Sequence, residues 1–306
     1  MLMGNTREYE VWRMNAFTDK PFSGNPAAVV YDADDLSDQS MQLIAPELNS
    51  ISETVFVSQA LDPSADIRLR YFTSTTEVDL CGHATISALF ALVTSNRITG
   101  DTGVQILHAE TRVGTLELGL IFNDGQLDWA TMTQLKPKFA QPTKPECIPE
   151  ILGISSESIR SDLTVACCST GIWSCYVPLI NLDALGTIRI QSKLIENLWP
   201  ENQELAGIYP FVITDINKAS GDLVTQGRFF SPPKYGIEED PVTGTACGAL
   251  GGHLINQGIL DRNAVLLARQ GLEMGRAGLV RVEQESNGAM RISGKAIPIL
   301  RGKVTI

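Results

Sequence analysis

The apolar and polar positions of the chain follow two periods, one typical of strands and one typical of buried helices. Strand-like alternation or clustering recurs in many short segments, namely 9–17, 27–31, 55–57, 67–72, 104–109, 115–122, 164–168, 173–179, 208–214, 223–230, 265–270, 278–284, 289–293 and 297–304. A helical pattern covers 36–48, where Ser37 fits the N-cap, and shorter ones cover 147–153 and 191–199. Segments 83–95 and 246–257 combine small and apolar residues, which predicts two helices buried on most sides.

This order of elements predicts an α+β fold with two lobes, each wrapping strands about one central helix. We expect the N-terminal lobe at 1–128, to which a strand at 297–306 could be added, and the C-terminal lobe at 129–296. The proline-bearing stretch 136–149 is the expected linker region.

A short motif repeats about half a chain apart, which is what two pseudo-symmetric lobes would show. An acidic residue, a loop, Cys-Gly and a small-residue helix occur first around Cys81-Gly82 and again around Cys247-Gly248. We expect both Cys-Gly pairs to start helices and to face one cleft.

Composition and charge narrow the class of protein. The chain has 306 residues, of which 43% are hydrophobic, and a net charge of −11, which argues against a nucleic-acid groove or an anionic membrane surface. It has no apolar run of the roughly 20 residues that a membrane helix needs and no basic-then-apolar signal, so we expect a cytoplasmic protein. Its six cysteines form no paired framework and lack ligand spacing to the histidines, so we expect reduced thiols and no metal.

The two expected helix starts are candidates for binding an anion. Small residues such as Gly82 and Thr245 leave backbone N–H groups uncovered, although small residues also simply let helices pack. Cysteines at such positions tend to have a lowered pKa, so Cys81 and Cys247 could act as a pair of thiols that remove and return a proton. They could equally be small buried hydrophobic residues, and the sequence pattern leaves both alternatives open.

Three other residues could take part in acid–base chemistry. Glu53 lies just before the apolar strand at 55–57, where burial would shift its pKa toward a value suited to proton transfer. His83 could donate to a substrate oxygen, and Asp240 could bind a substrate amine or orient His83. For each of them a structural role, as a solvated carboxylate, a cap or a turn residue, is the alternative.

Several motifs together resemble the phenazine-biosynthesis isomerase (PhzF-like) family, which has the diaminopimelate-epimerase fold. The resemblance runs from end to end and rests on five segments in the family's order, namely 15–27, Ser52-Glu-Thr-Val-Phe56, Arg70-Tyr-Phe-Thr73, Cys81-Gly-His-Ala-Thr85 and Glu239-Asp-Pro-Val-Thr-Gly-Thr-Ala246. It implies two pseudo-symmetric lobes, each a curved, mostly antiparallel sheet around a central helix. It also implies a homodimer that uses no cofactor.

The resemblance also implies roles for individual residues. Glu53 takes the position of the family's general acid–base carboxylate, with His83 and Asp240 beside it in the catalytic set. Substrate contacts would come from Ser52, Asn25, the backbone of Gly82 and the hydroxyl of Thr245, the last two holding a substrate carboxylate.

One departure from the family keeps two alternatives open. Cys81 and Cys247 resemble the thiol pair of the epimerase and racemase branch, which the phenazine enzyme lacks, but His83 stands where that branch has asparagine. We therefore favour a proton-moving isomerase based on Glu53. The alternatives are an amino-acid epimerase or racemase that uses both thiols and a catalytically idle small-molecule-binding or interaction protein.

Overall fold

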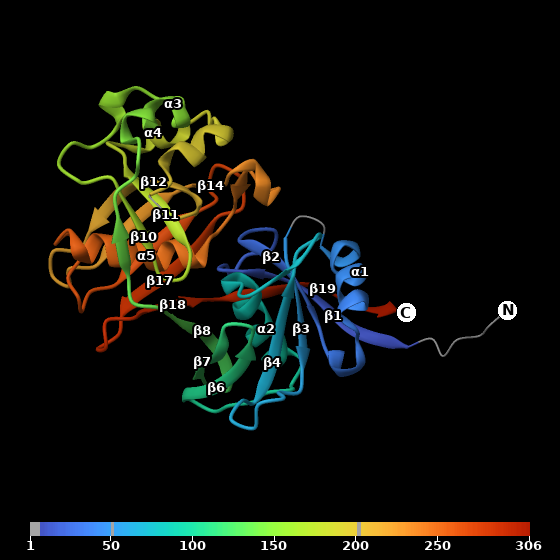
Figure 1. Cartoon of the computed structure of the whole chain (residues 1–306). Coiled ribbons are helices and arrows are strands. Elements are labelled where there is room, and N and C mark those ends of the chain that lie inside the picture. Colours follow the sequence, from blue (N-terminus) through green and yellow to red (C-terminus); the bar gives the residue numbers. More distant parts are fainter. Residues whose placement is uncertain (1–6, 50–51, 201–202) are drawn as a thin grey trace. The chain divides into compact units, whose positions relative to one another are not determined.

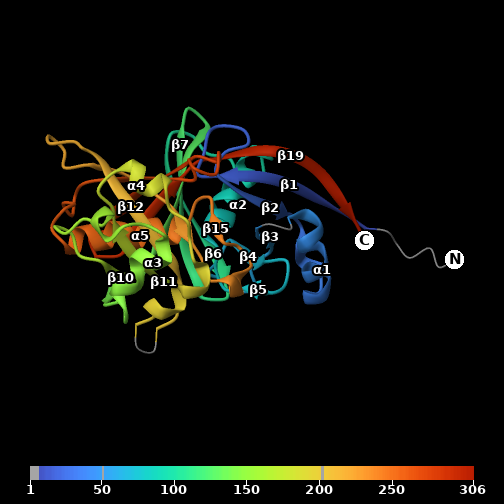
Figure 2. The same ribbon diagram turned by 90° about the horizontal axis from the view of Figure 1, so that it is seen from above.

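The computed structural model describes residues 7–49, 52–200 and 203–306, and the chain divides into two compact units. Unit 1 comprises Met1–Met132 and Gly294–Ile306, and unit 2 comprises Thr133–Ser293. The C-terminal strand β19 (Ala296–Thr305) therefore belongs to unit 1, where it pairs with the first strand, β1 (Glu8–Ala16). Both ribbon views show these two strands side by side (Figure 1, Figure 2).

Unit 1 is a mostly antiparallel set of strands with one central helix. Its other strands are β2 (Asn25–Val30), β3 (Thr54–Ser58), β4 (Ile67–Phe72), β5 (Glu77–Val78), β6 (Gly103–Thr111), β7 (Gly114–Asn123) and β8 (Gln126–Gln134). Only the β2–β3 and β4–β6 pairs are parallel among the described pairs of this unit. The helix α2 (Gly82–Thr94) packs against these strands and buries 11 of its 13 residues, so it forms the core of the unit.

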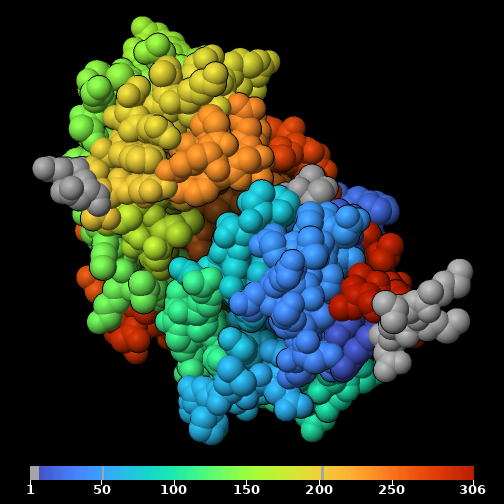
Figure 3. All heavy atoms as spheres, turned by 45° about the vertical axis from the view of Figure 1, so that its right-hand side comes forward, coloured from blue at the N-terminus to red at the C-terminus, as the bar shows by residue number. Residues whose placement is uncertain are grey.

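The second helix of unit 1, α1 (Asp38–Leu48), lies on the surface (Figure 3). The Ser37 side chain accepts a hydrogen bond from the Ser40 backbone N–H at 3.1 Å, so the predicted N-cap is confirmed. The helix ends at Asn49, whose backbone N–H is bonded to the Ala45 carbonyl.

Unit 2 repeats this plan with its own strands and helix. Its strands are β9 (Lys138–Ala140), β10 (Ala166–Ser169), β11 (Trp173–Pro178), β12 (Leu205–Ile216), β13 (Leu223–Gly227), β14 (Phe229–Phe230), β15 (Glu239–Asp240), β16 (Leu266–Gln270), β17 (Gly278–Gln284) and β18 (Met290–Gly294). Two short helices, α3 (Ile148–Leu152) and α4 (Leu182–Gly186), accompany the central helix α5 (Gly244–Asn256), which buries 10 of its 13 residues. Figure 1 shows α5 enclosed by the strands of its unit, as α2 is by those of unit 1.

The sequence pattern misplaced several boundaries. The expected linker at 136–149 contains strand β9 and the start of α3, and the expected strand 223–230 is two strands, β13 and β14. Strand β8 was not predicted, although it follows the turn residue Gly125, whose φ of 76° suits glycine. Among the helices of the described residues, none is long and apolar enough to cross a membrane.

The chain enters each central helix through the same local arrangement. In unit 1, Arg70 forms a two-pronged ion pair with Glu77, and its guanidinium lies 5.2 Å from the Phe72 ring centre. In unit 2, Arg228 does the same with Glu239 and lies 4.7 Å from the Phe230 ring centre. The strand register agrees as well, because Phe72 pairs with Glu77 and Phe230 with Glu239.

This internal repeat corrects the register that the Cys-Gly motif predicted. Four residues after each glutamate comes the N-cap of the central helix, which is Cys81 for α2 and Thr243 for α5. Cys81-Gly82 therefore starts a helix, as predicted, but Cys247-Gly248 does not. Cys247 is the fourth residue of α5, and the residue that corresponds to Cys81 is Thr243.

Candidate active site

The backbone of Glu53 is fixed where a parallel pair of strands begins. Its carbonyl accepts hydrogen bonds from the Ala28 N–H and from the Asn49 side-chain amide, both at 3.3 Å. The next four residues, 54–57, are buried, so the strand that follows Glu53 is anchored in the core. The carboxylate is thus held at the entrance of β3, and its side chain remains 21% exposed.

The side chains of Ser52, Glu53 and His83 form a closed hydrogen-bonded group. The Ser52 hydroxyl donates to Glu53 Oε2 at 2.9 Å and lies 2.9 Å from His83 Nε2, while Glu53 Oε2 and His83 Nε2 are 3.2 Å apart. Because the hydroxyl proton is used on Glu53, the serine oxygen can only accept from His83. The network therefore assigns a proton to Nε2 of His83.

Cys81 completes this cluster from the helix N-cap. Its Sγ lies 3.4 Å from His83 Nδ1 and 3.7 Å from Nε2. A carboxylate oxygen of Glu53, the Cys81 sulfur and a ring nitrogen of His83 all lie within 4.8 Å of one another, a combination that can hold a metal ion. The expectation that the protein uses no metal stays a prediction.

Charge pairing sets the ionisation of Glu53 and His83. Burial raises the pKa of Glu53, but the charge and hydrogen bond of His83 and the Ser52 hydroxyl outweigh it and hold that pKa well below its usual range. Burial in turn lowers the pKa of His83, but the neighbouring Cys81 and Glu53 raise it well above its usual value. The sequence-based expectation of a pKa shifted by burial was wrong for Glu53, because it did not include the histidine beside it.

Neither candidate thiol has the lowered pKa that a helix start would give. Burial, followed by the negative charge of Glu53, raises the pKa of Cys81. Burial raises the pKa of Cys247 to about 12. The Cys247 sulfur is fully buried 3.6 Å from the Tyr209 hydroxyl, one turn inside α5, where the first N–H groups of the helix no longer point at it. All six cysteines of the chain are free thiols.

The candidate residues of unit 2 cluster around the start of α5. The Thr243 hydroxyl donates to Asp240 Oδ2 at 2.6 Å, and the Thr243 N–H donates to the Gln270 side-chain oxygen at 3.1 Å. Gln270 is fully buried, and its amide also donates to the Asp240 carbonyl at 2.7 Å. The loop that carries Asp240 is therefore fixed by two residues, Thr243 and Gln270, that the sequence analysis did not single out.

The remaining predicted residues occupy defined places in the two units. Asn25 is buried as the first residue of β2, Gly82 is the first residue of α2, and Thr245 is half-buried in the first turn of α5. The structure thus brings Ser52, Glu53, Cys81 and His83 together in unit 1, and Asp240 and Thr245 close in sequence around the N-cap of α5 in unit 2. The expectation that both sets serve one cleft stays a prediction.

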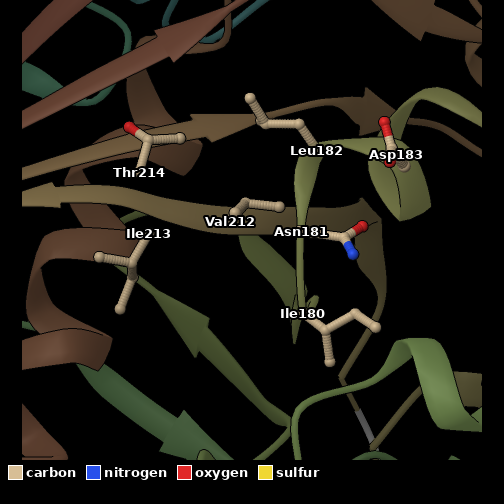
Figure 4. A pocket seen from close by; sticks show the side chains of 7 residues that line it. All are labelled: Ile180, Asn181, Leu182, Asp183, Val212, Ile213 and Thr214. Carbon is tan, nitrogen blue, oxygen red and sulfur yellow. The ribbon is translucent and has the colours of Figure 1, made fainter.

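A further pocket, of about 420 Å³, lies on unit 2 beside β12 (Figure 4). It is lined by Ile180, Asn181, Leu182, Asp183, Val212, Ile213 and Thr214. None of the predicted site residues lines it.

The chain is similar to known proteins along nearly its whole length. Residues 14–302 match the model of the family described as phenazine biosynthesis-like protein. The chain is 35% identical over 299 residues to the uncharacterized isomerase YfhB of Bacillus subtilis, covering 94% of each chain. It is 29% identical over 297 residues to the trans-2,3-dihydro-3-hydroxyanthranilate isomerase of Pseudomonas fluorescens, covering 96% of this chain and 98% of the other.

A solved structure of a PhzF-family phenazine biosynthesis protein from Bacillus anthracis superposes with a TM-score of 0.84. It is 31% identical and covers 98% of this chain and 100% of its own. The protein is an isomerase with the predicted α+β fold of the diaminopimelate-epimerase type. It belongs to the phenazine biosynthesis-like (PhzF) family.

Proposed function

We propose that this isomerase works without a cofactor and that Glu53 removes a proton from a carbon atom of a small carboxylate-containing metabolite and returns it elsewhere on the same molecule. One observation carries the proposal: Glu53 is held as a carboxylate by His83 and Ser52 at the entrance of a buried strand. An ionised carboxylate with one partly exposed edge is the form that can accept a proton. The double bond of the substrate would shift with the proton.

The ion pair suggests how the base is made stronger when substrate arrives. A carboxylate held by an imidazolium is a weak base, because its pKa is low. If the substrate carboxylate takes the hydrogen bond of His83, the stabilisation of Glu53 falls while its burial remains. The pKa of Glu53 then rises toward a value at which it accepts a proton from carbon.

The other predicted residues take supporting roles in this proposal. Ser52 orients the carboxylate of Glu53 through its hydroxyl. The backbone of Gly82 and the hydroxyl of Thr245 hold the substrate carboxylate, Asp240 binds a substrate amine or hydroxyl, and Asn25 lines the site. The Pseudomonas fluorescens relative is named for a dihydro-hydroxyanthranilate substrate, which supports a cyclic amino acid-like substrate class. The active form would be a homodimer in the cytoplasm.

The alternative with two thiols has less support. Cys81 is the N-cap of α2, where a thiolate can be stabilised, but the corresponding residue of unit 2 is Thr243 and not Cys247. Cys247 is fully buried, and burial raises its pKa to about 12. Neither observation favours a thiolate mechanism. The third alternative, an idle binding protein, would bind ligands without exchanging their protons with solvent, whereas an enzyme would exchange them.

The test is solvent-deuterium incorporation into candidate substrates, beginning with 2,3-dihydro-3-hydroxyanthranilate. Glu53→Gln should reduce the exchange rate by ~10²–10⁴-fold, the usual contribution of a general acid–base residue. Glu47→Gln, which changes an exposed carboxylate at the end of α1, is the matched control and should keep the wild-type rate. Full exchange in Glu53→Gln would contradict the proposal. If no exchange is detected although ligands bind, the idle binding protein is favoured.

A further inference from the structure

The proposed reaction assigns no role to Cys81 of unit 1. Cys81 is a free thiol, 7% exposed, at the N-cap of α2, and its sulfur lies against the ring of His83. Glu53 Oε2 lies 3.2 Å from Nε2 of the same ring. A thiol, an imidazole and a carboxylate thus converge from two separate elements, the start of β3 and the start of α2.

We propose that Glu53, Cys81 and His83 also form a binding site for a thiophilic divalent ion such as Zn²⁺, and that the bound ion inhibits the enzyme. The inhibition, but not the binding, rests on the function proposed above.

The spacing of the ligand atoms suits tetrahedral coordination. With metal–nitrogen and metal–oxygen bonds near 2.0–2.1 Å and a metal–sulfur bond near 2.3 Å, neighbouring ligand atoms lie about 3.3–3.6 Å apart. Glu53 Oε2 and His83 Nε2 are 3.2 Å apart, and Cys81 Sγ and His83 Nε2 are 3.7 Å apart. All three ligand atoms lie within 4.8 Å of one another, which is the separation expected of residues that share one ion.

The chemistry of the three ligands selects the kind of ion. A thiolate and an imidazole favour zinc and similar transition metals over magnesium and calcium, which prefer oxygen ligands. Coordination requires the thiol and the imidazolium to lose one proton each. A doubly charged ion then replaces two protons, so the total charge of the buried cluster does not change. This removes the main cost of placing an ion there.

The bound ion would stop proton transfer for a simple reason. A Glu53 oxygen that is bonded to the metal no longer accepts a proton from the substrate, and His83 no longer donates from Nε2. Inhibition would be reversed when a chelator removes the ion.

Binding is measured first, without any assay of activity. Chelator-treated wild-type protein is titrated with Co²⁺ alone, and the absorption spectrum is recorded. Tetrahedral cobalt with a cysteine ligand shows visible ligand-field bands and a near-ultraviolet band that marks the thiolate–metal bond. We expect one equivalent of Co²⁺ to give both, and Zn²⁺ to displace it.

Two variants identify the ligands. Cys81→Ser should abolish the thiolate band and weaken binding by more than ~100-fold, because loss of an outer partner alone costs 10–100-fold. Cys147→Ser removes a half-buried free thiol elsewhere and should leave the spectrum unchanged. Should Cys81→Ser fail to fold, Glu53→Gln replaces it, and it should keep the thiolate band but weaken binding. A wild-type protein that gives no thiolate band, or a band that survives Cys81→Ser, would overturn the proposal.

Inhibition is then measured as loss of deuterium exchange on adding Zn²⁺ to wild-type enzyme and to Cys147→Ser. If Glu53→Gln abolishes exchange but the wild-type protein does not bind Co²⁺, the proposed function is supported and the metal site is ruled out. If Co²⁺ binds through Cys81 but Glu53→Gln exchanges normally, the metal site stands and the proposed function falls. Exchange that continues when the site is saturated with Zn²⁺ would overturn the inhibition.

Discussion

The two units share the structure of the segment that precedes the central helix, but they differ in the side chains at the start of that helix. Each has an arginine–glutamate ion pair over a phenylalanine ring, followed four residues later by the N-cap of a 13-residue buried helix. In unit 1 the helix start carries Cys81 and His83, next to Glu53. In unit 2 the corresponding positions are Thr243 and Thr245, and the Thr243 hydroxyl is bonded to Asp240.

The two units therefore share the structure of the repeat but not the side chains that could take part in proton transfer. The arginine–glutamate pair and the small residues of the helix are present in both units. A carboxylate, an imidazole and a thiol gather at the helix start of unit 1. An epimerase that removes a proton on one side and returns it on the other needs such groups from two opposed sources. The comparison therefore favours one base, Glu53, that both removes and returns the proton.

The strongest test of the comparison substitutes the corresponding residues of the two helix starts, one at a time. His83→Gln removes the charge that pairs with Glu53 and should lower kcat/KM by roughly 10²–10³-fold, within the range of a residue that assists proton transfer. Thr245→Val, at the same position of α5, should raise KM with little change in kcat, because the role we propose for Thr245 is to bind the substrate carboxylate. Steady-state kinetics of both variants measure this. Equal losses of kcat would show that the two units share the chemistry.

The pH profile of the same variants sharpens this result. The pKa of Glu53 is held low by His83, so wild-type kcat/KM should keep its value as the pH falls until well below the usual carboxyl range. In His83→Gln burial is left without this opposing effect, and the pKa of Glu53 should rise. The acid limb should then move to higher pH by more than about one unit. An unchanged acid limb would show that Glu53 is not the group that titrates.

The two buried histidines should affect stability with opposite signs. Burial lowers the pKa of His253 in unit 2 to about 4, so the folded state favours the neutral imidazole. Folding stability is therefore lost as the pH falls from about 6.5 to 4, because the unfolded chain takes up the proton first. At roughly 1.4 kcal/mol per pKa unit, the loss reaches roughly 3 kcal/mol at pH 4. His83 has a raised pKa, so its contribution is present below pH 6.5 and is lost as the pH rises through the raised value.

Urea unfolding from pH 4 to 9 measures both effects. As the pH falls, the free energy of unfolding should decrease less for His253→Gln than for wild type. For His83→Gln the difference from wild type should instead shrink as the pH rises. The same pH dependence in both variants would contradict the assignment of the two pKa directions.

The smallest expected effect is on stability, and it tests the arginine–glutamate ion pair that both units contain. Arg70→Met and Arg228→Met each remove the two-pronged partner of a largely buried glutamate, and each should cost about 2 kcal/mol of stability. Glu77 keeps a second ion pair, with Arg112 at 3.1 Å, so the loss in Arg70→Met should be the smaller of the two. Because the two ion pairs have the same geometry, the two losses in unfolding free energy should agree within about 1 kcal/mol. A larger difference would show that the repeat is not equivalent in energy.

The sequence predicted the fold class, the two buried helices and most strands, because periodicity and turn residues are local signals. It also singled out Glu53 and His83, which stand in short motifs. It failed where the answer depends on contacts between distant residues. Two identical letters, Cys-Gly, suggested a match of Cys81 with Cys247, whereas strand register and helix start match Cys81 with Thr243.

The pKa of Glu53 was misjudged for the same reason. Its partner, His83, is 30 residues away, and only the packing of β3 against α2 brings the two within 3.2 Å. Asn49 and Gln270 were missed because they bind the backbone of other segments and carry no motif of their own. A buried amide with such a role gives no local sequence signal.

The pairing of β19 with β1 has a consequence for how the protein is made. Unit 1 is assembled from the first 132 residues and from Gly294–Ile306, so the ribosome must first synthesise the intervening residues of unit 2 before the sheet around α2 closes. Unit 2 is one continuous stretch and can fold while translation continues. Until then β1 has an open edge, which other chains can pair with. The helix that carries His83 therefore gains part of its packing, the contacts with β19, only after unit 2 has been synthesised, and a chain that lacks β19 should be prone to aggregate.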